Sequence, residues 1–353
     1  MKASLHGSRT GGPRLESLRP GAAMPGGEVE LLGTALQPEP SGVLPTVRVG
    51  DASAHVALSR PDRAVIHLME GTISGDVQLN LGQTKSNSLA LRVAVPMAEG
   101  LHPVANPAVD SDGTVYATVS GTRGQSVPVS IFSVARDFQL RPFVRGLMNA
   151  TGLAFGPDGF LYASSRAEGT VYRISSDGEM STYAEGMGIA TGIAFDGDGN
   201  LYVGDRSGTI FRVGPDRGAM AERQIFVYAT LEPSIAAYHL AFNNGGTLFV
   251  TGPTTSSNQA VYAIDRDGHT TVFHRGLGRA QGMALDVDGN LYVAASLRGQ
   301  RGIVRITPGR EASLVLSGNN LVGLAFLDDG MAALATRDAL YHVALDVEGR
   351  PLP

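Results

Sequence analysis

Polar side chains with hydroxyl, amide and imidazole groups recur along this chain at similar intervals. Thr151, Thr191, Tyr238 and Gln281 follow one another 40, 47 and 43 residues apart, and His239 comes directly after the tyrosine. Histidine titrates near neutrality and can act as a general base, so His239 and Gln281 are the candidate catalytic residues. The two threonines and the tyrosine are candidate ligand-binding residues. The alternative is that all these groups line a channel and satisfy one another and water.

Arginine supplies a second set of candidate ligand-binding residues. They are Arg123, Arg166, Arg206, Arg279 and Arg298, most of them in expected loops on the same side as the polar groups. Guanidinium groups bind carboxylate and phosphate in a bidentate manner, so a mouth lined with arginine would attract an anion. Exposed loops also carry charges for solubility, and Asp205 would neutralise the arginine that follows it. Both interpretations stay open.

Several kinds of chemistry have no motif in this sequence. The chain has no Cys, and it contains no H-E-x-x-H, Walker A or G-x-S-x-G pattern. Zinc-protease, nucleotide-binding and Ser-hydrolase activities are therefore unsupported. The stretches 196–199 and 286–289 begin like calcium loops, but they lack the terminal Glu. Because Asp-Gly is a preferred turn between antiparallel strands, we expect hairpin turns at these places.

Composition indicates a folded globular chain. A hydrophobic share of 43% and 46 Gly among 353 residues predict short strands joined by many tight turns. The net charge of −5 argues against nucleic-acid binding, and no run is long and apolar enough to span a membrane. The first residues lack the apolar stretch of a signal peptide. The compartment stays open between the cytoplasm and, if a leader has been removed, the periplasm or exterior.

A nine-residue pattern explains the regular spacing of the candidate residues. It has the form x-G-L-A-F-x-x-D-G and starts six times, at Ala105, Thr151, Thr191, Tyr238, Gln281 and Val322. Each copy is followed by alternating runs such as 161–163 and 171–174, which have the period of half-buried strands. Repeats of this length with several strands each are typical of β-propellers. We therefore predict a six-bladed propeller over residues 96–353.

The two ends of the repeat array need separate interpretation. The last copy ends too close to the C-terminus to supply its own outer strand, and residues 95–101 are similar to the outer strand of other copies. We expect this segment to complete the last blade and protect its edge. Residues 13–95 carry short alternating runs between Gly and Pro, which predicts a small Ig-like β-sandwich. Residues 1–12 are expected to be disordered. The predicted fold class is all-β.

Both parts of the chain resemble known families. Residues 13–95, with P-R-L-E-S-L-R-P-G, G-G-E-V-E-L-L-G and S-G-D-V-Q-L, resemble the TIG (IPT) immunoglobulin-like domain. The repeats resemble NHL propellers and the gluconolactonase/senescence-marker group, which implies one divalent metal held in the channel by Glu, Asn and Asp. The aligned positions here are Ala105, Tyr238 and Gln281, and none is a carboxylate. No metal or other cofactor is therefore predicted.

Two functions follow from these observations, and a third uses the fold alone. The first is binding of a small polar or anionic ligand, or of a protein surface, at the mouth of a propeller with a degenerate lactonase-type site. The alternative is a lactonase-like hydrolase that uses His239, Gln281 and Arg279. A scaffolding role is the third. The identity of the ligand or partner and the oligomeric state are not specified by the sequence.

Overall fold

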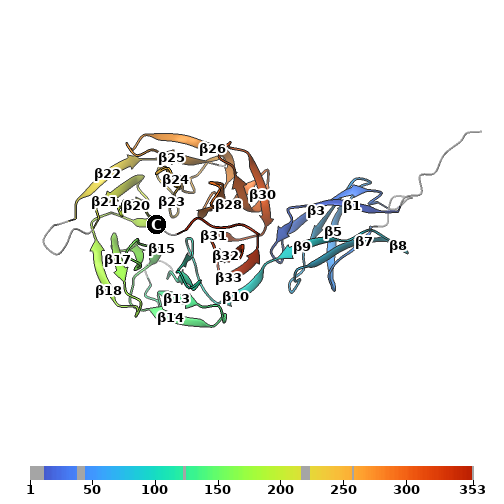
Figure 1. The fold of residues 1–353 in the computed structure, drawn as a ribbon, viewed down its shortest axis with the longest axis horizontal. Coiled ribbons are helices and arrows are strands. Elements are labelled where there is room, and N and C mark those ends of the chain that lie inside the picture. The colour runs from blue at the N-terminus through green and yellow to red at the C-terminus, as the bar shows by residue number, and fades with distance from the viewer. Residues whose placement is uncertain (1–11, 38–43, 122–124, 216–222, 257, 352–353) are drawn as a thin grey trace, which may run out of the picture. The chain divides into compact units, whose positions relative to one another are not determined.

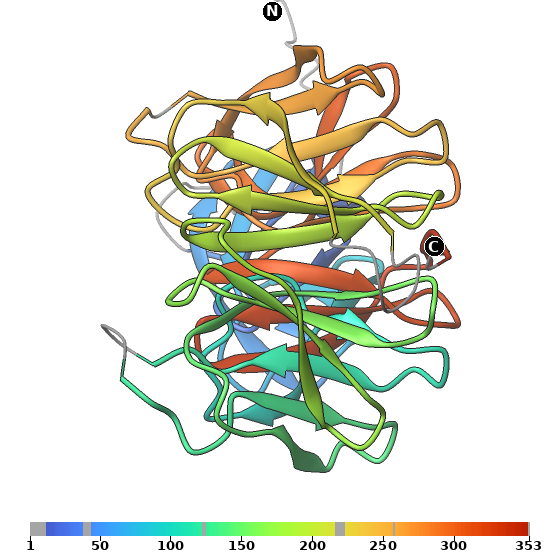
Figure 2. The same ribbon diagram turned by 90° about the vertical axis from the view of Figure 1, so that its left-hand side faces the viewer.

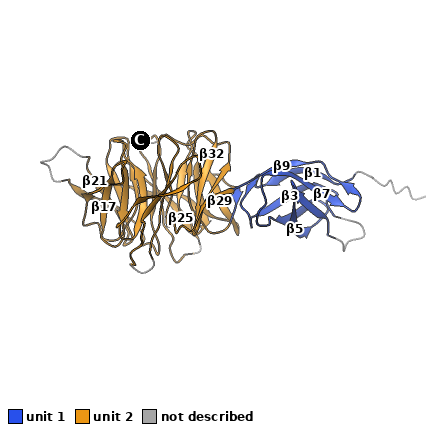
Figure 3. Ribbon diagram, turned by 90° about the horizontal axis from the view of Figure 1, so that it is seen from below, with its two compact units in different colours: residues 1–94, 316–318 blue, residues 95–315, 319–353 orange. Residues whose placement is uncertain are grey.

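A computed structural model describes residues 12–37, 44–121, 125–215, 223–256 and 258–351 (Figure 1). Throughout these ranges every regular element is a β-strand and no helix occurs, so the predicted all-β class is confirmed. The segment expected to be disordered lies, apart from its last residue, outside the described residues. The chain divides into two compact units, which Figure 3 colours separately: residues 1–94 with 316–318, and residues 95–315 with 319–353.

The first unit contains nine short strands. They are β1 (Arg14–Arg19), β2 (Ala22–Ala23), β3 (Glu28–Thr34), β4 (Thr46–Val49), β5 (Ala52–Ser59), β6 (Arg63–His67), β7 (Gly75–Leu81), β8 (Thr84–Lys85) and β9 (Leu89–Val93). β1, β3, β6 and β5 pair in that order, and β4, β8 and β9 each pair with β7, all antiparallel. The buried positions alternate in β4, where Val47 and Val49 join one core with Leu31 and Leu79. This alternation is the pattern expected from the sequence.

The second unit, called the propeller-like unit, consists of antiparallel groups of four strands. The strands are β10 (Val95–Glu99), β11 (Ala108–Val109), β12 (Val115–Thr118), β13 (Ile131–Val134), β14 (Leu140–Val144), β15 (Ala150–Phe155), β16 (Leu161–Ser165), β17 (Thr170–Ile174), β18 (Met180–Ala184), β19 (Ala190–Phe195), β20 (Leu201–Asp205), β21 (Thr209–Val213), β22 (Ile225–Thr230), β23 (His239–Phe242), β24 (Leu248–Thr251), β25 (Gln259–Ile264), β26 (Thr270–Gly278), β27 (Met283–Leu285), β28 (Leu291–Leu297), β29 (Gln300–Ile306), β30 (Ala312–Ser317), β31 (Leu321–Phe326), β32 (Met331–Thr336) and β33 (Ala339–Ala344). Within each group consecutive strands pair with one another, as in β15–β18 and β19–β22. Figures 1 and 2 show the groups arranged around a common centre, which is a propeller-like architecture.

The last group takes its outer strand from the beginning of the propeller-like unit. β10 pairs antiparallel with β33, so that Val95 lies opposite His342 and Glu99 opposite Ala339. The sheet order is β10-β33-β32-β31, and the expected completion of the last group by residues 95–101 is confirmed for 95–99. Because β33 pairs with β10, the backbone groups along that side of β33 are not free to pair with a strand of another chain.

Where the second position of the repeat is glycine, the inner strands of neighbouring groups approach one another so closely that no side chain fits. A Cβ on Gly192 would lie 2.2 Å from the carbonyl oxygen of Tyr238, and one on Gly152 would lie 2.4 Å from that of Thr191. Contacts this short are not tolerated between real atoms. The repeated Gly therefore sets how tightly the groups close around the centre.

Candidate functional site

The centre of the propeller-like unit encloses a cavity of about 230 Å³, called the central cavity. Its wall is made mainly by the second to fifth positions of the repeat on the inner strands, together with Ala105 at a first position and one residue near the C-terminus. Most of these positions carry Gly, Ala, Leu, Met or Phe. The polar side chains on the wall are those of Asn106, His239 and Arg350. The site is therefore a mostly apolar chamber with few polar groups, which is typical of small-molecule pockets.

His239 is the first residue of β23, and it occupies the same position of the repeat as Gly192 in β19. Its residue is 3% exposed, and it lines the central cavity. No hydrogen bond of its ring is found within the described part of the chain, and its nitrogens are not among the fully buried unpartnered atoms, so they border the open space of the cavity. Burial lowers the pKa of His239 to about 4, because the cationic form loses its hydration. At neutral pH the ring is uncharged, so it can donate one hydrogen bond and accept another.

Asn106 also replaces glycine at the second position, but its amide is already engaged. Nδ2 donates to the carbonyl oxygen of Met283 at 2.6 Å, and Oδ1 accepts the backbone N–H of Leu324 at 3.2 Å. These bonds tie β27 and β31 together through one side chain. A Cβ on Gly282 would lie 2.0 Å from Oδ1 of Asn106, so the neighbouring glycine makes room for the amide. Asn106 is a structural link in the cavity wall.

Arg350 reaches the central cavity from the C-terminal segment. Its backbone N–H donates to the carbonyl oxygen of Leu285 at 3.0 Å, and Nη1 donates to the carbonyl oxygen of Phe242. Burial lowers the pKa of this guanidinium, because its charge is partly removed from water. Arg350 was missed by the sequence reasoning. It lies after the last repeat, and no motif there indicated that the chain returns to the centre.

The threonines and the tyrosine proposed as ligand-binding residues are buried and engaged with the backbone. Thr151 donates its hydroxyl to the carbonyl oxygen of Asn149 at 3.0 Å, and Thr191 donates to that of Gly204 at 2.7 Å. Thr191 also accepts the N–H of Tyr238, whose own hydroxyl donates to the carbonyl oxygen of Glu232. The two threonines and the tyrosine are at most 2% exposed, and none of them lines the central cavity. These first-position side chains have backbone partners and do not line the central cavity, and their role in ligand binding stays a prediction.

Gln281 is placed like these residues, although it is less deeply buried. Its Nε2 donates to the carbonyl oxygen of Leu321 at 3.0 Å, and its own carbonyl accepts the hydroxyl of Thr251 at 2.6 Å. It does not line the central cavity. The structure therefore brings His239 to the cavity but not the second candidate catalytic residue.

The predicted arginine cluster is brought together only in part. The pKa of Arg166 is lowered, mainly by burial and in smaller part by the positive charge of Arg206, so the two guanidinium groups lie close together. Arg166 donates to the carbonyl oxygen of Gly121 at 3.4 Å, and Arg206 to that of Ile235 at 3.2 Å. The remaining candidates are dispersed: Arg279 and Arg298 are exposed, and Arg123 lies outside the described residues.

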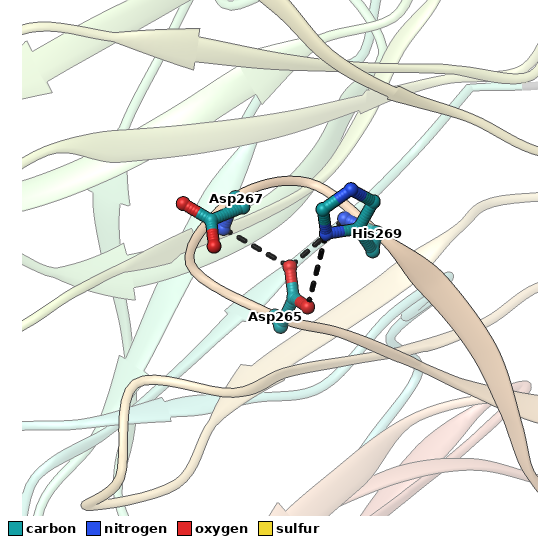
Figure 4. A group of neighbouring side chains, drawn as sticks. All are labelled: Asp265, Asp267 and His269. Carbon is teal, nitrogen blue, oxygen red and sulfur yellow. Dashed lines mark hydrogen bonds and ion pairs between the residues drawn. The ribbon is translucent and has the colours of Figure 1, made fainter.

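Among the residues that the structure describes, the channel offers no metal site of the kind implied by the lactonase resemblance. Of the aligned positions, Ala105 has no donor side chain, and the side chains of Tyr238 and Gln281 are held by backbone carbonyls. Within the described ranges, one group of carboxylate and imidazole atoms is close enough to hold an ion: Asp265, Asp267 and His269, on an exposed turn (Figure 4). The carboxylate of Asp265 accepts the backbone N–H groups of the other two, which is turn chemistry. The residues in the channel do not fit the metal.

Other Asp-Gly turns show the same pattern, in which an aspartate carboxylate accepts backbone N–H groups of its own turn. Oδ1 of Asp196 accepts the N–H of Asp198 at 3.0 Å and that of Asn200 at 2.9 Å. The predicted turn role of these aspartates is confirmed.

In the described part of the chain, no helix is long and apolar enough to cross a membrane.

Comparisons with known proteins agree with the propeller-like fold. A family profile for strictosidine synthase-like proteins, N-terminal part, matches residues 192–213. A solved protein proposed as a gluconolactonase has a TM-score of 0.59 at 19% identity, with 73% of this chain and 93% of that chain covered. A gluconolactonase from Xanthomonas campestris has a TM-score of 0.56 at 13% identity, with 76% and 90% covered. An auxiliary nutrient binding protein from Bacteroides ovatus has a TM-score of 0.52 at 11% identity, with 95% and 98% covered.

No curated protein matches this chain. Identities this low show a common fold and nothing finer, so the chain has a propeller-like architecture similar to that of gluconolactonases. The family match lies wholly in the propeller-like unit. The resemblance of residues 13–95 to a TIG domain therefore stays a prediction.

Proposed function

We propose that this protein binds a small, uncharged molecule in the central cavity of a six-bladed propeller that follows an Ig-like domain. The observation that carries the proposal is His239, a neutral imidazole without a protein partner in an apolar chamber. The ring nitrogens of His239 are not among the fully buried atoms without a partner, and the residue lines the cavity, so a ligand can reach them. A ligand with an apolar body and one hydrogen-bonding group would bond to the ring and fill the chamber.

The charge of the wall argues for an uncharged ligand. His239 is neutral at physiological pH, and Asn106 is committed to the backbone. Arg350 already donates to a carbonyl oxygen at the cavity wall. An anion in this chamber would lose its hydration against mostly apolar side chains, and the guanidinium of Arg350 is the one cationic group on the described wall. The likeness to an auxiliary nutrient binding protein over 95% of this chain supports a binding role for the whole architecture.

A second candidate function is metal-independent hydrolysis of a lactone, favoured by the same histidine. The neutral ring would accept a proton from a water molecule as that water adds to the lactone carbonyl. The ring C–O bond would then break, and the departing alkoxide would take the proton back to give a hydroxy acid. Because the pKa of His239 is about 4, this activity would be independent of pH above about 5 and would be lost as the pH falls through about 4.

Arg166 and Arg206 favour an anionic ligand in the loops as a third arrangement. Their charges lie close together, and each guanidinium donates to a carbonyl oxygen. The Nε atom of Arg206 is buried and has no partner among the described residues. An anion between the two side chains would relieve the repulsion between them. This ligand would differ in charge from the one proposed for the central cavity.

The test of the binding proposal uses small uncharged cyclic compounds as probes. Titration calorimetry with δ-valerolactone, glucono-δ-lactone and cyclohexanone should detect binding of at least one compound to the full chain. His239→Gly gives this position the same residue as Gly192 in the preceding inner strand. It should weaken binding of that compound at least tenfold, as expected for one lost hydrogen bond. Gln281→Ala, which changes a side chain outside the cavity, should leave binding unchanged.

The same samples decide between binding and hydrolysis. Turnover of a lactone in metal-free buffer that disappears in His239→Gly would establish the hydrolase and replace the binding role. If no probe binds, or if binding survives His239→Gly unchanged, the central cavity is not the ligand site. Circular dichroism of each variant at the same temperature confirms that the fold is retained.

A further inference from the structure

Two cavities occupy equivalent places on the face that carries the Asp-Gly turns. The Arg136 cavity, of about 150 Å³, lies between the β31–β33 group with β10 and the β11–β14 group. The Arg212 cavity, of about 180 Å³, lies between the β19–β22 and β23–β26 groups. The repeat places these residues in equivalent positions: Arg136 and Arg266, Asp328 and Gly197, His342 and Arg212. The two cavities can therefore be compared residue by residue.

In the Arg136 cavity the cationic group is neutralised within the protein. Nη2 of Arg136 lies 2.7 Å from Oδ2 of Asp328. The rings of Phe138 and His342 stack with their centroids 4.8 Å apart and cover the adjoining wall. Burial lowers the pKa of this histidine and so favours its uncharged form. The wall of this cavity is thus apolar beside an internal ion pair.

In the Arg212 cavity the acidic partner is replaced by glycine. Gly197 occupies the position of Asp328, and Arg212 occupies the position of His342. Arg266 and Arg350 complete the cationic wall. None of these three guanidinium groups forms an ion pair within the described ranges. The Nε atom of Arg212 is buried without a hydrogen-bond partner.

The carboxylate of Asp196, on the wall of the Arg212 cavity, is occupied by its own turn. Asp196 accepts the N–H groups of Asp198 and Asn200, the side-chain amide of Asn200 at 2.8 Å, and the hydroxyl of Tyr202 at 3.1 Å. Asp198 is the second acidic residue on the wall, against three arginines. The lining thus carries more positive than negative charge. The volume far exceeds the roughly 10–15 Å³ that one water molecule requires.

We propose that the Arg212 cavity is a second binding site, which takes an oxyanion such as the phosphate or carboxylate group of a small molecule. Arg212 and Arg266 would supply planar donor pairs, which suit the geometry of these anions. Arg350 lines both this cavity and the central cavity, so it would contribute its remaining donors from the shared wall. Burial without a carboxylate partner lowers the pKa of Arg350, and a bound anion would supply the missing charge.

The experiment measures binding of inorganic phosphate to the full chain at constant ionic strength, held with sodium chloride. Calorimetry and thermal unfolding should both report binding to the wild type. Arg266→Gln and Arg212→Gln should each weaken it at least tenfold. Arg275→Gln is the matched control, because this exposed arginine lies outside both cavities. No binding to the folded wild type, or equal binding in Arg266→Gln, would overturn the proposal.

The most specific variant introduces into the Arg212 cavity an acidic residue at the position that Asp328 occupies in the Arg136 cavity. Gly197 has ordinary backbone geometry, and a Cβ there meets no atom within 4 Å, so substitution is sterically free. Gly197→Asp should pair with Arg266 as Asp328 does with Arg136, and should abolish phosphate binding. Gly197→Asn has the same size without the charge and should retain at least a third of the affinity. Equal loss in both variants would contradict the role of charge.

A further arm separates this site from the loops on the opposite face. Arg206→Gln removes a guanidinium near Arg166 and leaves the Arg212 cavity intact. Phosphate binding that is lost in Arg206→Gln and retained in Arg266→Gln would place the anion in the loops and overturn the proposal. The result is independent of the central cavity, because the uncharged probes used for His239 do not report on phosphate.

Discussion

The central cavity and the Arg212 cavity lie in the same propeller-like unit, yet their chemistry is opposite. The first is mostly apolar and presents a neutral imidazole. The second is polar and carries three guanidinium groups, all without an ion pair among the described residues. In each place one residue differs from its counterpart in another copy: His239 stands where four of the six copies have glycine, and Gly197 stands, at a variable position of the repeat, where the copy beside the Arg136 cavity has Asp328.

This comparison shows how a repeated backbone acquires distinct sites. The repeated residues set the approach of the strands, as at Gly192, where no side chain fits. Residues that differ between copies change the neighbours of a side chain. His239 lines the cavity where Gly192 has no side chain, and Arg266 has glycine where Arg136 has an acidic partner. Differences between copies are therefore the places where ligand chemistry is expected.

The largest effect should come from placing a side chain where the repeat still has glycine. Gly192→Ala puts a Cβ 2.2 Å from the carbonyl oxygen of Tyr238, so the inner strands must move apart. We expect a loss of about 3 kcal/mol in the free energy of unfolding, at the upper end for overpacking. Urea denaturation measures it, with Gly197→Ala as the control in open space. A loss below about 1 kcal/mol would mean that the strands separate easily.

A similar effect should follow protonation of His239. Its pKa in the folded protein, about 4, lies below the ordinary value of 6.5, so the unfolded chain binds the proton more tightly. Stability from the neutral ring is complete above about pH 6.5 and falls as the pH drops towards 4. The full shift corresponds to about 3 kcal/mol. Urea denaturation from pH 7 to pH 4 should therefore show a steeper loss in the wild type than in His239→Asn. Parallel curves would show that the ring is solvated.

The smallest effect should come from breaking the ion pair of the Arg136 cavity. Both side chains of the Arg136–Asp328 pair are about two-thirds exposed, at 66% and 68%. Asp328→Asn should therefore lower the free energy of unfolding by less than about 1 kcal/mol. It should not create a phosphate site, because His342 holds the position of Arg212 and no counterpart of Arg350 lines this cavity. Phosphate titration of this variant checks that statement.

The strand pattern of the propeller-like unit was predictable from local sequence. Runs such as 161–163 and 201–203 lie within β16 and β20, and the Asp-Gly stretches form the expected turns. The pairing of residues 95–99 with β33 was also anticipated, because the last repeat lacks an outer strand. These features depend on alternation, turn chemistry and the count of strands per repeat, all of which are written in neighbouring residues.

The orientation of the candidate side chains was not predictable in the same way. Thr151 and Gln281 carry suitable groups at the ends of inner strands, but close strand packing directs their groups to backbone partners. His239, which was singled out because it departs from the repeat, lines the central cavity. Which first- and second-position side chains reach the centre depends on how far neighbouring strands twist and how closely they approach.

Local sequence thus specified the all-β class, the repeats and the residues that depart from them. The tertiary structure decided which departures form sites. Arg350 lies beyond the last repeat and reaches the centre through backbone hydrogen bonds to Leu285. Arg212 and Arg266 are 54 residues apart and share one cavity only because two neighbouring groups pack side by side. Contacts between residues so distant in the chain are set by strand closure, which no local pattern encodes.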